Sequence, residues 1–172
     1  MELLAPAGGM EQLKAALRFG ADAVYGGMKQ YGLRAFAGNF DEAALAEAAE
    51  RCHQQGAKFY VTMNVLPTDK ELDGFAEAGR TALRCGADAV YLGASAFNAR
   101  QGAHNFDTAA LREAVSYCHA RGVAVHLTLN TLVRQDELHA ALKVAEEACV
   151  LGVDALIVQD VGLARRIRAA AP

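Results

Sequence analysis

Several polar side chains are predicted to gather where short apolar segments end. Thr62–Asn64 and Thr128–Asn130 each close an apolar run, and Gln159-Asp160 closes a third. Alternate side chains of a strand share a face, so the threonine and asparagine of each segment point the same way. Such amides and carboxylates can hold a polar ligand, or they can bond to nearby backbone or cap a helix. The candidate substrate-binding residues here are Asn64, Asn130, Gln159 and Asp160.

Two arginines are further candidates for substrate binding, and a glycine turn is a candidate for binding anions. Arg34 and Arg100 lie in long loops that contain glycine, and a guanidinium binds carboxylate or phosphate with two hydrogen bonds. Pairing with a nearby acid is the alternative for both. Gly8 and Gly9 precede a predicted helix, whose first N–H groups could receive an anion, although a tight turn explains the same residues.

Other catalytic patterns are missing from the sequence. The two serines are not in a GxSxG turn, and no HExxH occurs. Cys52 and Cys118 fall on the apolar stripe of predicted helices, which favours buried thiols. The adjacent histidines point about 100° away from them, which argues against a Cys/His pair within either dipeptide. The spacing of the cysteines predicts no metal site.

The chain repeats itself after 66 residues. Residues 20–85 and 86–151 align without a gap, with 26 identical positions in 66, and the hexapeptide at 20–25 returns at 86–91 and, more weakly, at 152–157. A repeat of this kind indicates architecture before any single motif is considered.

Each repeat contains two βα units, so six are predicted in all. Strands are expected at Glu2–Ala5, Ala21–Tyr25, Lys58–Met63, Ala87–Leu92, Val123–Leu129 and Val153–Val158. Helices are expected at Met10–Phe19, Asp41–Gln55, Asp69–Cys85, Asp107–Arg121, Asp136–Leu151 and Gly162–Ala171. Asp41 is a predicted N-cap, and glycines 20, 56, 86, 122 and 152 are predicted to close helices.

This alternation predicts an α/β fold of parallel βα repeats that is partly TIM-barrel-like. We expect one domain over residues 1–172, with the internal repeat inside it. Because a complete barrel has eight strands, six would leave open edges. The sequence therefore predicts self-association or a further C-terminal portion.

Composition sets broad limits on function. A net charge of −3 gives no overall basic character for unaided nucleic-acid binding, which weighs mildly against an RNA role. The apolar runs are short and the N-terminus lacks signal-peptide features, so we expect a cytoplasmic protein without a membrane association.

Three segments resemble the start of the collagenase-like peptidases of family U32. They are residues 1–8, residues 20–25 and residues 32–40, and the Thr-x-Asn strand ends and residues 152–160 are also similar to that family. The resemblance covers essentially the whole chain. It implies a TIM-barrel-like N-terminal domain and a peptidase activity, whereas other members act in hydroxylation of tRNA or ribosomal RNA or in quinone biosynthesis.

The resemblance also implies an iron–sulfur cluster in some members, held by cysteines further along the chain. None of the four cysteines here matches those ligands, so the sequence predicts no cofactor in this chain. Three hypotheses follow: a U32-type peptidase, a non-catalytic duplicated scaffold that self-associates, and part of an RNA-hydroxylating enzyme. The substrate is accordingly expected to be a peptide or RNA.

Overall fold

Parallel strands and helices alternate along the chain. The computed structural model describes residues 2–29, 39–63, 72–94, 96–97 and 108–170, with only the backbone of 72–76. The described strands are β1 (Leu4–Pro6), β2 (Ala23–Gly27), β3 (Lys58–Thr62), β4 (Ala89–Gly93), β5 (Ala124–Leu129) and β6 (Ala155–Val158). The described helices are α1 (Met10–Arg18), α2 (Glu42–Gln54), α3 (Leu72–Arg84), α4 (Thr108–His119), α5 (Leu138–Val150) and α6 (Val161–Ala170).

The strand order is that of a βα barrel. The strands run β1-β2-β3-β4-β5-β6 in the sheet, and the pairs β1–β2, β2–β3, β3–β4 and β5–β6 are parallel. The predicted α/β fold of six βα units, partly TIM-barrel-like, is confirmed. The chain divides into two compact units, Met1–Tyr91 and Leu92–Pro172.

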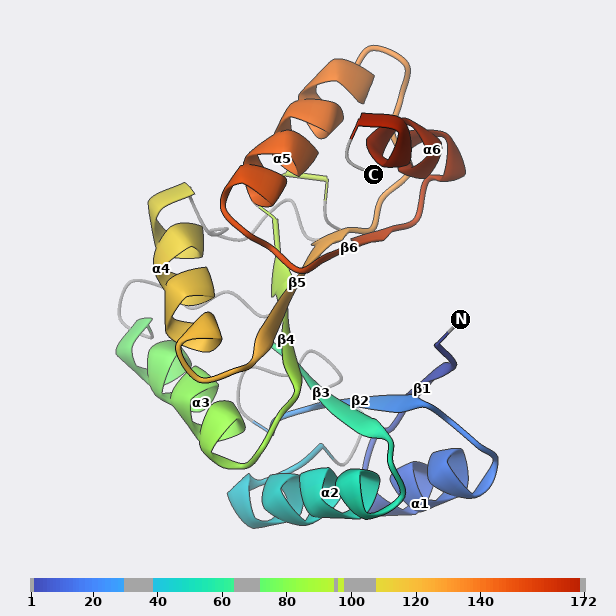
Figure 1. Ribbon diagram of the computed structural model, residues 1–172, viewed down its shortest axis with the longest axis vertical. Helices are drawn as coiled ribbons and strands as arrows, with labels where there is room; N and C mark the ends of the chain where they lie inside the picture. Colours follow the sequence, from blue (N-terminus) through green and yellow to red (C-terminus); the bar gives the residue numbers. More distant parts are fainter. Residues whose placement is uncertain (1, 30–38, 64–71, 95, 98–107, 171–172) are drawn as a thin grey trace. The chain divides into compact units, whose positions relative to one another are not determined.

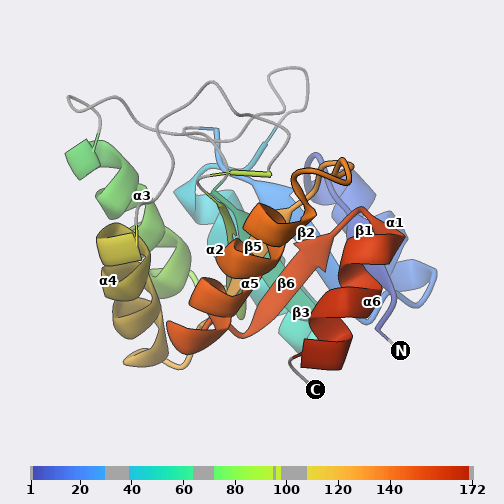
Figure 2. The ribbon, with the colours of Figure 1, turned by 90° about the horizontal axis from the view of Figure 1, so that it is seen from above.

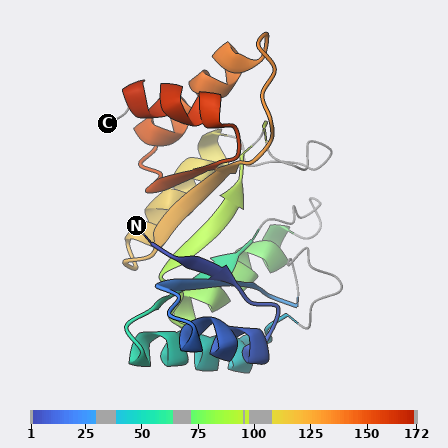
Figure 3. The same ribbon diagram turned by 90° about the vertical axis from the view of Figure 1, so that its right-hand side faces the viewer.

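In the first unit, α1 and α2 lie side by side on one face of β1, β2 and β3 (Figures 1 and 3). The core between these helices and strands is apolar. Leu13 and Leu45 come from the helices, and Val24 and Phe59 come from the strands; all four are at most 1% exposed. This burial follows from the apolar stripe of each helix, which needs a partner surface.

In the second unit, α5 and α6 are neighbours, and α6 also packs on β6 (Figures 2 and 3). Val125 and Leu127 of β5, Ala141 of α5 and Leu163 of α6 are fully or almost fully buried. The residues of β6 are only half-buried along its length.

Several local predictions are confirmed. Asp41 caps α2, since its side chain accepts a hydrogen bond from the Ala44 amide at 3.0 Å. Glycines 20, 56, 86, 122 and 152 all have positive φ, between 71° and 87°, directly after helices. L-residues with a Cβ rarely adopt this conformation, which is why glycine closes these helices.

Some predicted boundaries were wrong by one or two residues. The first strand runs over Leu4–Pro6 rather than Glu2–Ala5, and the second begins at Ala23 rather than Ala21. The reason is that the Leu3 carbonyl accepts bonds from both the Asp22 and Ala23 amides, so regular pairing starts at Leu4 and Ala23. The fifth helix begins at Leu138, two residues after the predicted start, because Asp136 and Glu137 form a turn with Arg134.

Candidate functional site

The carboxyl ends of β1 and β2 are tied together by backbone hydrogen bonds in the first unit. The Asn39 amide donates to the Gly8 carbonyl at 2.8 Å, and the Phe40 amide donates to the Gly27 carbonyl at 2.9 Å. Gly8 and Gly9 therefore lie where the loop after β2 returns to α2. Gly9 is the N-cap of α1, and because glycine has no side chain it makes no side-chain capping bond. Whether an anion binds there stays a prediction.

Gly26 is required at this end of the sheet because an aromatic ring occupies the space of a side chain. A Cβ on Gly26 would lie 2.5 Å from Cε2 of Phe40. Phe40 is 1% exposed and packs edge-on against Phe59, with ring centroids 5.7 Å apart. The ring thus holds the end of the loop against β2, which in turn places Gly8 and Asn39.

The threonines of the two Thr-x-Asn segments bond to neighbouring strands. Thr62 donates to the Gly26 carbonyl at 3.1 Å, and Thr128 donates to the Leu92 carbonyl at 3.2 Å. The two bonds are equivalent under the 66-residue repeat, each within its own unit. Of the two alternatives left open for this motif, backbone bonding holds for the threonines.

Asn130 follows β5 and is half-buried, with interactions of its own. Gln159 follows β6 and is exposed. The predicted residues Arg34, Asn64 and Arg100 lie outside the described residues. The structure therefore places Asn130, Gln159 and Asp160 at strand carboxyl ends of the second unit, and Gly8 and Gly9 at that of the first.

Asp160 caps α6 and anchors the loop before α5. Its Oδ1 accepts from the Leu163 amide at 2.8 Å, and its Oδ2 accepts from the Val133 amide at 3.2 Å. These backbone bonds, with that of Leu163 first, hold the pKa of the Asp160 carboxyl below its usual range. The capping alternative for Asp160 is thus confirmed. Both oxygens already accept bonds, so a ligand would have to share them.

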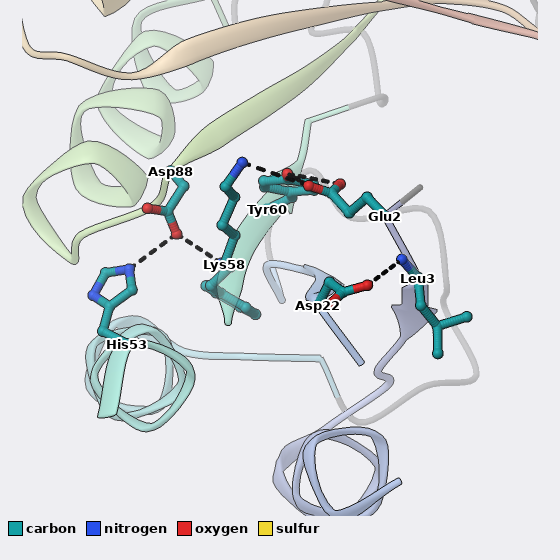
Figure 4. Close-up of polar contacts among 8 residues, drawn as sticks. Glu2, Leu3, Asp22, His53, Lys58, Tyr60 and Asp88 are labelled. Carbon is teal, nitrogen blue, oxygen red and sulfur yellow. Dashed lines mark hydrogen bonds and ion pairs between the residues drawn. The ribbon is translucent and has the colours of Figure 1, made fainter. Parts of the chain in front are cut away.

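Two His–Asp pairs were missed by the sequence reasoning. His53 Nε2 lies 2.9 Å from Asp88 Oδ2, and His119 Nε2 lies 2.8 Å from Asp154 Oδ2 (Figure 4 shows the first pair). Both pairs span 35 residues and are related by the repeat. Retention of both residues at the same offset in the two copies was the signal that could have revealed them.

The aspartate of each pair also receives a backbone N–H from the preceding odd-numbered strand. Asp88 Oδ2 accepts from the Phe59 amide and Asp154 Oδ2 from the Val125 amide, both at 2.7 Å. Asp22, the equivalent residue of the first copy of the hexapeptide, accepts from the Leu3 amide at 2.7 Å (Figure 4). We call this recurring contact the aspartate latch, formed by Asp22, Asp88 and Asp154.

The aspartate latch lies at the amino ends of β2, β4 and β6, since each aspartate directly precedes its strand. In βα barrels, chemistry is concentrated at the opposite, carboxyl ends, and the amino ends contribute stability. The His–Asp pairs are therefore structural clamps between a helix and two strands. They resemble a catalytic dyad only in residue type.

Buried thiols are equally poor candidates for a nucleophile. Cys52 and Cys118 are 0% and 5% exposed, as predicted, and burial raises the pKa of each thiol to about 11. A thiol with such a pKa carries almost no thiolate at neutral pH, and the thiolate is the reactive form.

Tyr25, Tyr60 and Tyr91 form an aromatic cluster in the first unit. The Tyr60 hydroxyl donates to both carboxylate oxygens of Glu2, at 2.9 and 3.0 Å (Figure 4). The ring of Tyr91 lies 5.8 Å from that of Tyr60 and 6.1 Å from that of Tyr25. Burial, followed by the Glu2 carboxylate, raises the pKa of Tyr60. Because Tyr60 and Tyr91 are 4% and 7% exposed, this cluster is packing rather than an open platform for stacking bases.

An iron–sulfur cluster does not fit the cysteines of this chain. Such clusters need several thiolates converging on one point. Cys52 is buried in α2 and Cys118 in α4, and burial raises the pKa of each thiol, which disfavours the thiolate form. Across the part of the chain that the structure describes, no group of three or more His, Cys, Asp and Glu residues could hold a metal ion.

Comparison with known proteins gives a family match over both halves of the chain. The family described as "Peptidase family U32" matches residues 8–81 and again residues 74–172. The double match agrees with the internal repeat.

The chain spans less than a fifth of the length of three curated relatives that it matches. It is 49% identical over 73 residues to a tRNA hydroxylation protein P1 of Bacillus subtilis (42% of this chain, 17% of that protein). It is 42% identical over 88 residues to the 23S rRNA 5-hydroxycytidine C2501 synthase of Escherichia coli (51% and 13%). A collagenase of Porphyromonas gingivalis is 40% identical over 72 residues (41% and 17%). Each match spans less than a fifth of the relative.

Solved structures with the same fold are distant in sequence. The chain superposes on 3-dehydroquinate dehydratase from Aquifex aeolicus with a TM-score of 0.62 and 17% identity, covering 98% of this chain and 72% of that one. For 2,3-dimethylmalate lyase the TM-score is 0.65 at 16% identity, with 99% and 62% covered. At such identity these likenesses show the fold alone. No helix among the described residues is both long and apolar enough to cross a membrane.

Proposed function

Because this chain belongs to peptidase family U32, we propose that it is the RNA-binding barrel segment of an RNA-hydroxylating protein. The observation that carries the proposal is the similarity to two RNA-hydroxylation proteins, one acting on tRNA and one on 23S rRNA. The peptidase hypothesis has less support. The collagenase match favours it, but the His–Asp pairs lie at the amino ends of strands and the buried thiols are unreactive.

The part assigned to this chain is binding rather than the oxidation itself. Hydroxylation replaces a C–H bond by C–OH and needs an oxidising co-reactant. That co-reactant is assigned to a part of the protein outside the described residues of this chain. The strand carboxyl ends, with Asn130, Gln159 and Asp160 in the second unit, are the proposed place for the RNA.

The direct test is nucleoside analysis of RNA from the source cells. Deletion of the gene should remove one hydroxylated nucleoside from tRNA or 23S rRNA, as measured by liquid chromatography and mass spectrometry. Restoring the gene should restore that nucleoside. Unchanged hydroxylation in both RNAs would overturn the proposal.

The same purified protein tests the peptidase hypothesis. We expect no cleavage of casein or denatured collagen by folded protein. Cleavage that persists through purification, together with unchanged RNA, would establish the peptidase in place of the RNA role.

A further inference from the structure

Helix α6 carries an unbalanced cluster of positive charge. Arg165, Arg166 and Arg168 are all exposed, and the helix Val161–Ala170 contains none of the 20 acidic residues of the chain. The net charge of −3 conceals this local excess. We refer to these three side chains as the arginine face.

The apolar side of α6 is already used inside the second unit. Leu163 is 0% exposed, Ile167 is half-buried, and α6 packs against α5 and β6 (Figure 3). An amphipathic helix that binds a membrane surface needs its apolar side free to insert. On α6 that side packs against α5 and β6, so the exposed arginines are the groups available to a binding partner.

Some arginines on other helices pair with acids of their own helix, whereas Arg18, Arg112 and Arg121 are in no ion pair among the described residues. Arg51 Nε lies 2.8 Å from Glu47, and Arg80 Nε lies 2.7 Å from Glu77. Among the described residues, no ion pair includes an arginine of the arginine face. A guanidinium without an internal acid keeps its full capacity to bind phosphate with two hydrogen bonds.

We propose that the arginine face binds the phosphate backbone of the substrate RNA. The inference rests on the function proposed above and names the surface that would carry it. Charge complementarity identifies the partner as a polyanion, because three exposed cations lie on a helix without an acidic residue. Contacts of this kind hold and orient RNA without reading its sequence.

The location of α6 connects this surface to the candidate site. Asp160 caps the helix at the carboxyl end of β6, and Arg165 follows it by five residues. At a rise of about 1.5 Å per residue, Arg165 lies about 7–8 Å along the helix axis from that cap. RNA bound to the arginine face would therefore pass close to Gln159 and Asp160.

The test compares two triple variants with the same net charge. Arg165→Gln, Arg166→Gln and Arg168→Gln together remove the arginine face. Arg18→Gln, Arg112→Gln and Arg121→Gln remove three exposed arginines from elsewhere in the chain. Each variant has a net charge of −3 − 3 = −6. Glutamine and arginine have similar helix propensities, and circular dichroism would verify that both variants fold.

The probe is an unmodified tRNA transcript, with binding measured by fluorescence anisotropy at several salt concentrations. Loss of the arginine face should weaken binding about tenfold or more at low salt, and should reduce the salt slope by about 2, since each neutralised phosphate contributes about 0.7. The control variant should bind nearly as the parent does.

Two results would overturn the inference. If both variants weakened binding equally, net charge rather than the arginine face would explain RNA binding. If the arginine-face variant bound tRNA as the parent does, the arginine face would not be the binding surface. Vesicles of phosphatidylserine serve as a second probe, and arginine-dependent binding to them without an effect on tRNA would point to a membrane instead. Loss of RNA hydroxylation on gene deletion with normal tRNA binding by the arginine-face variant would refute this surface while leaving the proposed function standing.

Discussion

His53 Nε2 and Asp88 Oδ2 lie 2.9 Å apart, and the same aspartate oxygen accepts the Phe59 amide at 2.7 Å. One carboxylate thus joins the end of α2 to the starts of β3 and β4. His119, Asp154 and Val125 repeat the arrangement in the second unit. In both copies the aspartate, rather than the histidine, is the centre of the contact.

Removal of the aspartate should therefore cost more stability than removal of the histidine. We expect Asp88→Ala to lower the free energy of unfolding by about 1–3 kcal/mol, because it leaves the part-buried Phe59 amide without its acceptor. His53→Ala should cost less than about 1 kcal/mol, since polar contacts between exposed side chains contribute little. Urea unfolding measures both. Asp22→Ala is the matched control and should have a smaller effect, because its partner Leu3 is exposed. A larger loss in His53→Ala than in Asp88→Ala would contradict the assignment.

The Asp160 cap should make stability depend on acid pH. Its folded pKa is lowered by the Leu163 and Val133 amides, so its contribution is fully present above the unfolded value of about 3.9. That contribution is lost as pH falls through the lower folded pKa. We expect the difference in melting temperature between the parent and Asp160→Asn to be largest near pH 7 and to shrink toward pH 2. A difference that grows on acidification would show the opposite sign of shift.

Two glycine-to-alanine changes should have opposite effects. Gly26→Ala places a Cβ 2.5 Å from the buried Phe40 ring, and overpacking of this kind costs about 1–3 kcal/mol. Gly79 lies within α3, and among the described residues a Cβ there would meet the end of the Met63 side chain, with Cε at 3.4 Å. Replacing a helical glycine gains about 0.5–1 kcal/mol, so Gly79→Ala should be more stable than the parent. Adding Phe40→Leu to Gly26→Ala should recover part of the loss, and absence of any recovery would place the strain elsewhere.

Cys149 should react with a thiol reagent much faster than the buried Cys52 and Cys118. Cys149 is exposed and should react with Ellman's reagent in the native protein. Cys52 and Cys118 should react only on unfolding, because burial raises the pKa of each to about 11. The Cys149→Ser variant should lose the fast phase of the reaction. Fast labelling of Cys52 or Cys118 in folded protein, located by mass spectrometry, would reopen a nucleophilic role.

Much of the fold could be predicted from local pattern. The alternation of apolar runs with helical stripes gave all the described strands and helices, and Asp41 and the helix-closing glycines were identified by residue type and position. Boundaries were less accurate. Leu3 and Asp22 look like strand residues in the sequence, yet their backbone bonds belong to the turn that starts the β1–β2 pairing.

The candidate site was predictable in position but not in bonding. Thr62 and Thr128 do lie at strand carboxyl ends, and each hydroxyl is committed to a neighbouring strand. Capping of α6 by Asp160 was one of the two alternatives left open by the sequence, whereas its second bond, to Val133, could not be foreseen. That bond joins residues 27 apart, and its existence depends on where a loop returns.

The sequence by itself determined the order of the βα units, their duplication and the residue types at the ends of strands and helices, because these follow from spacing within a few residues. Only the tertiary structure decided which groups meet. The partners of Asp88 are 35 and 29 residues away, and they converge because three elements pack in one register. In the second unit, packing on α5 and β6 buries one side of α6 and leaves its arginines exposed, a separation that a net charge of −3 could not reveal.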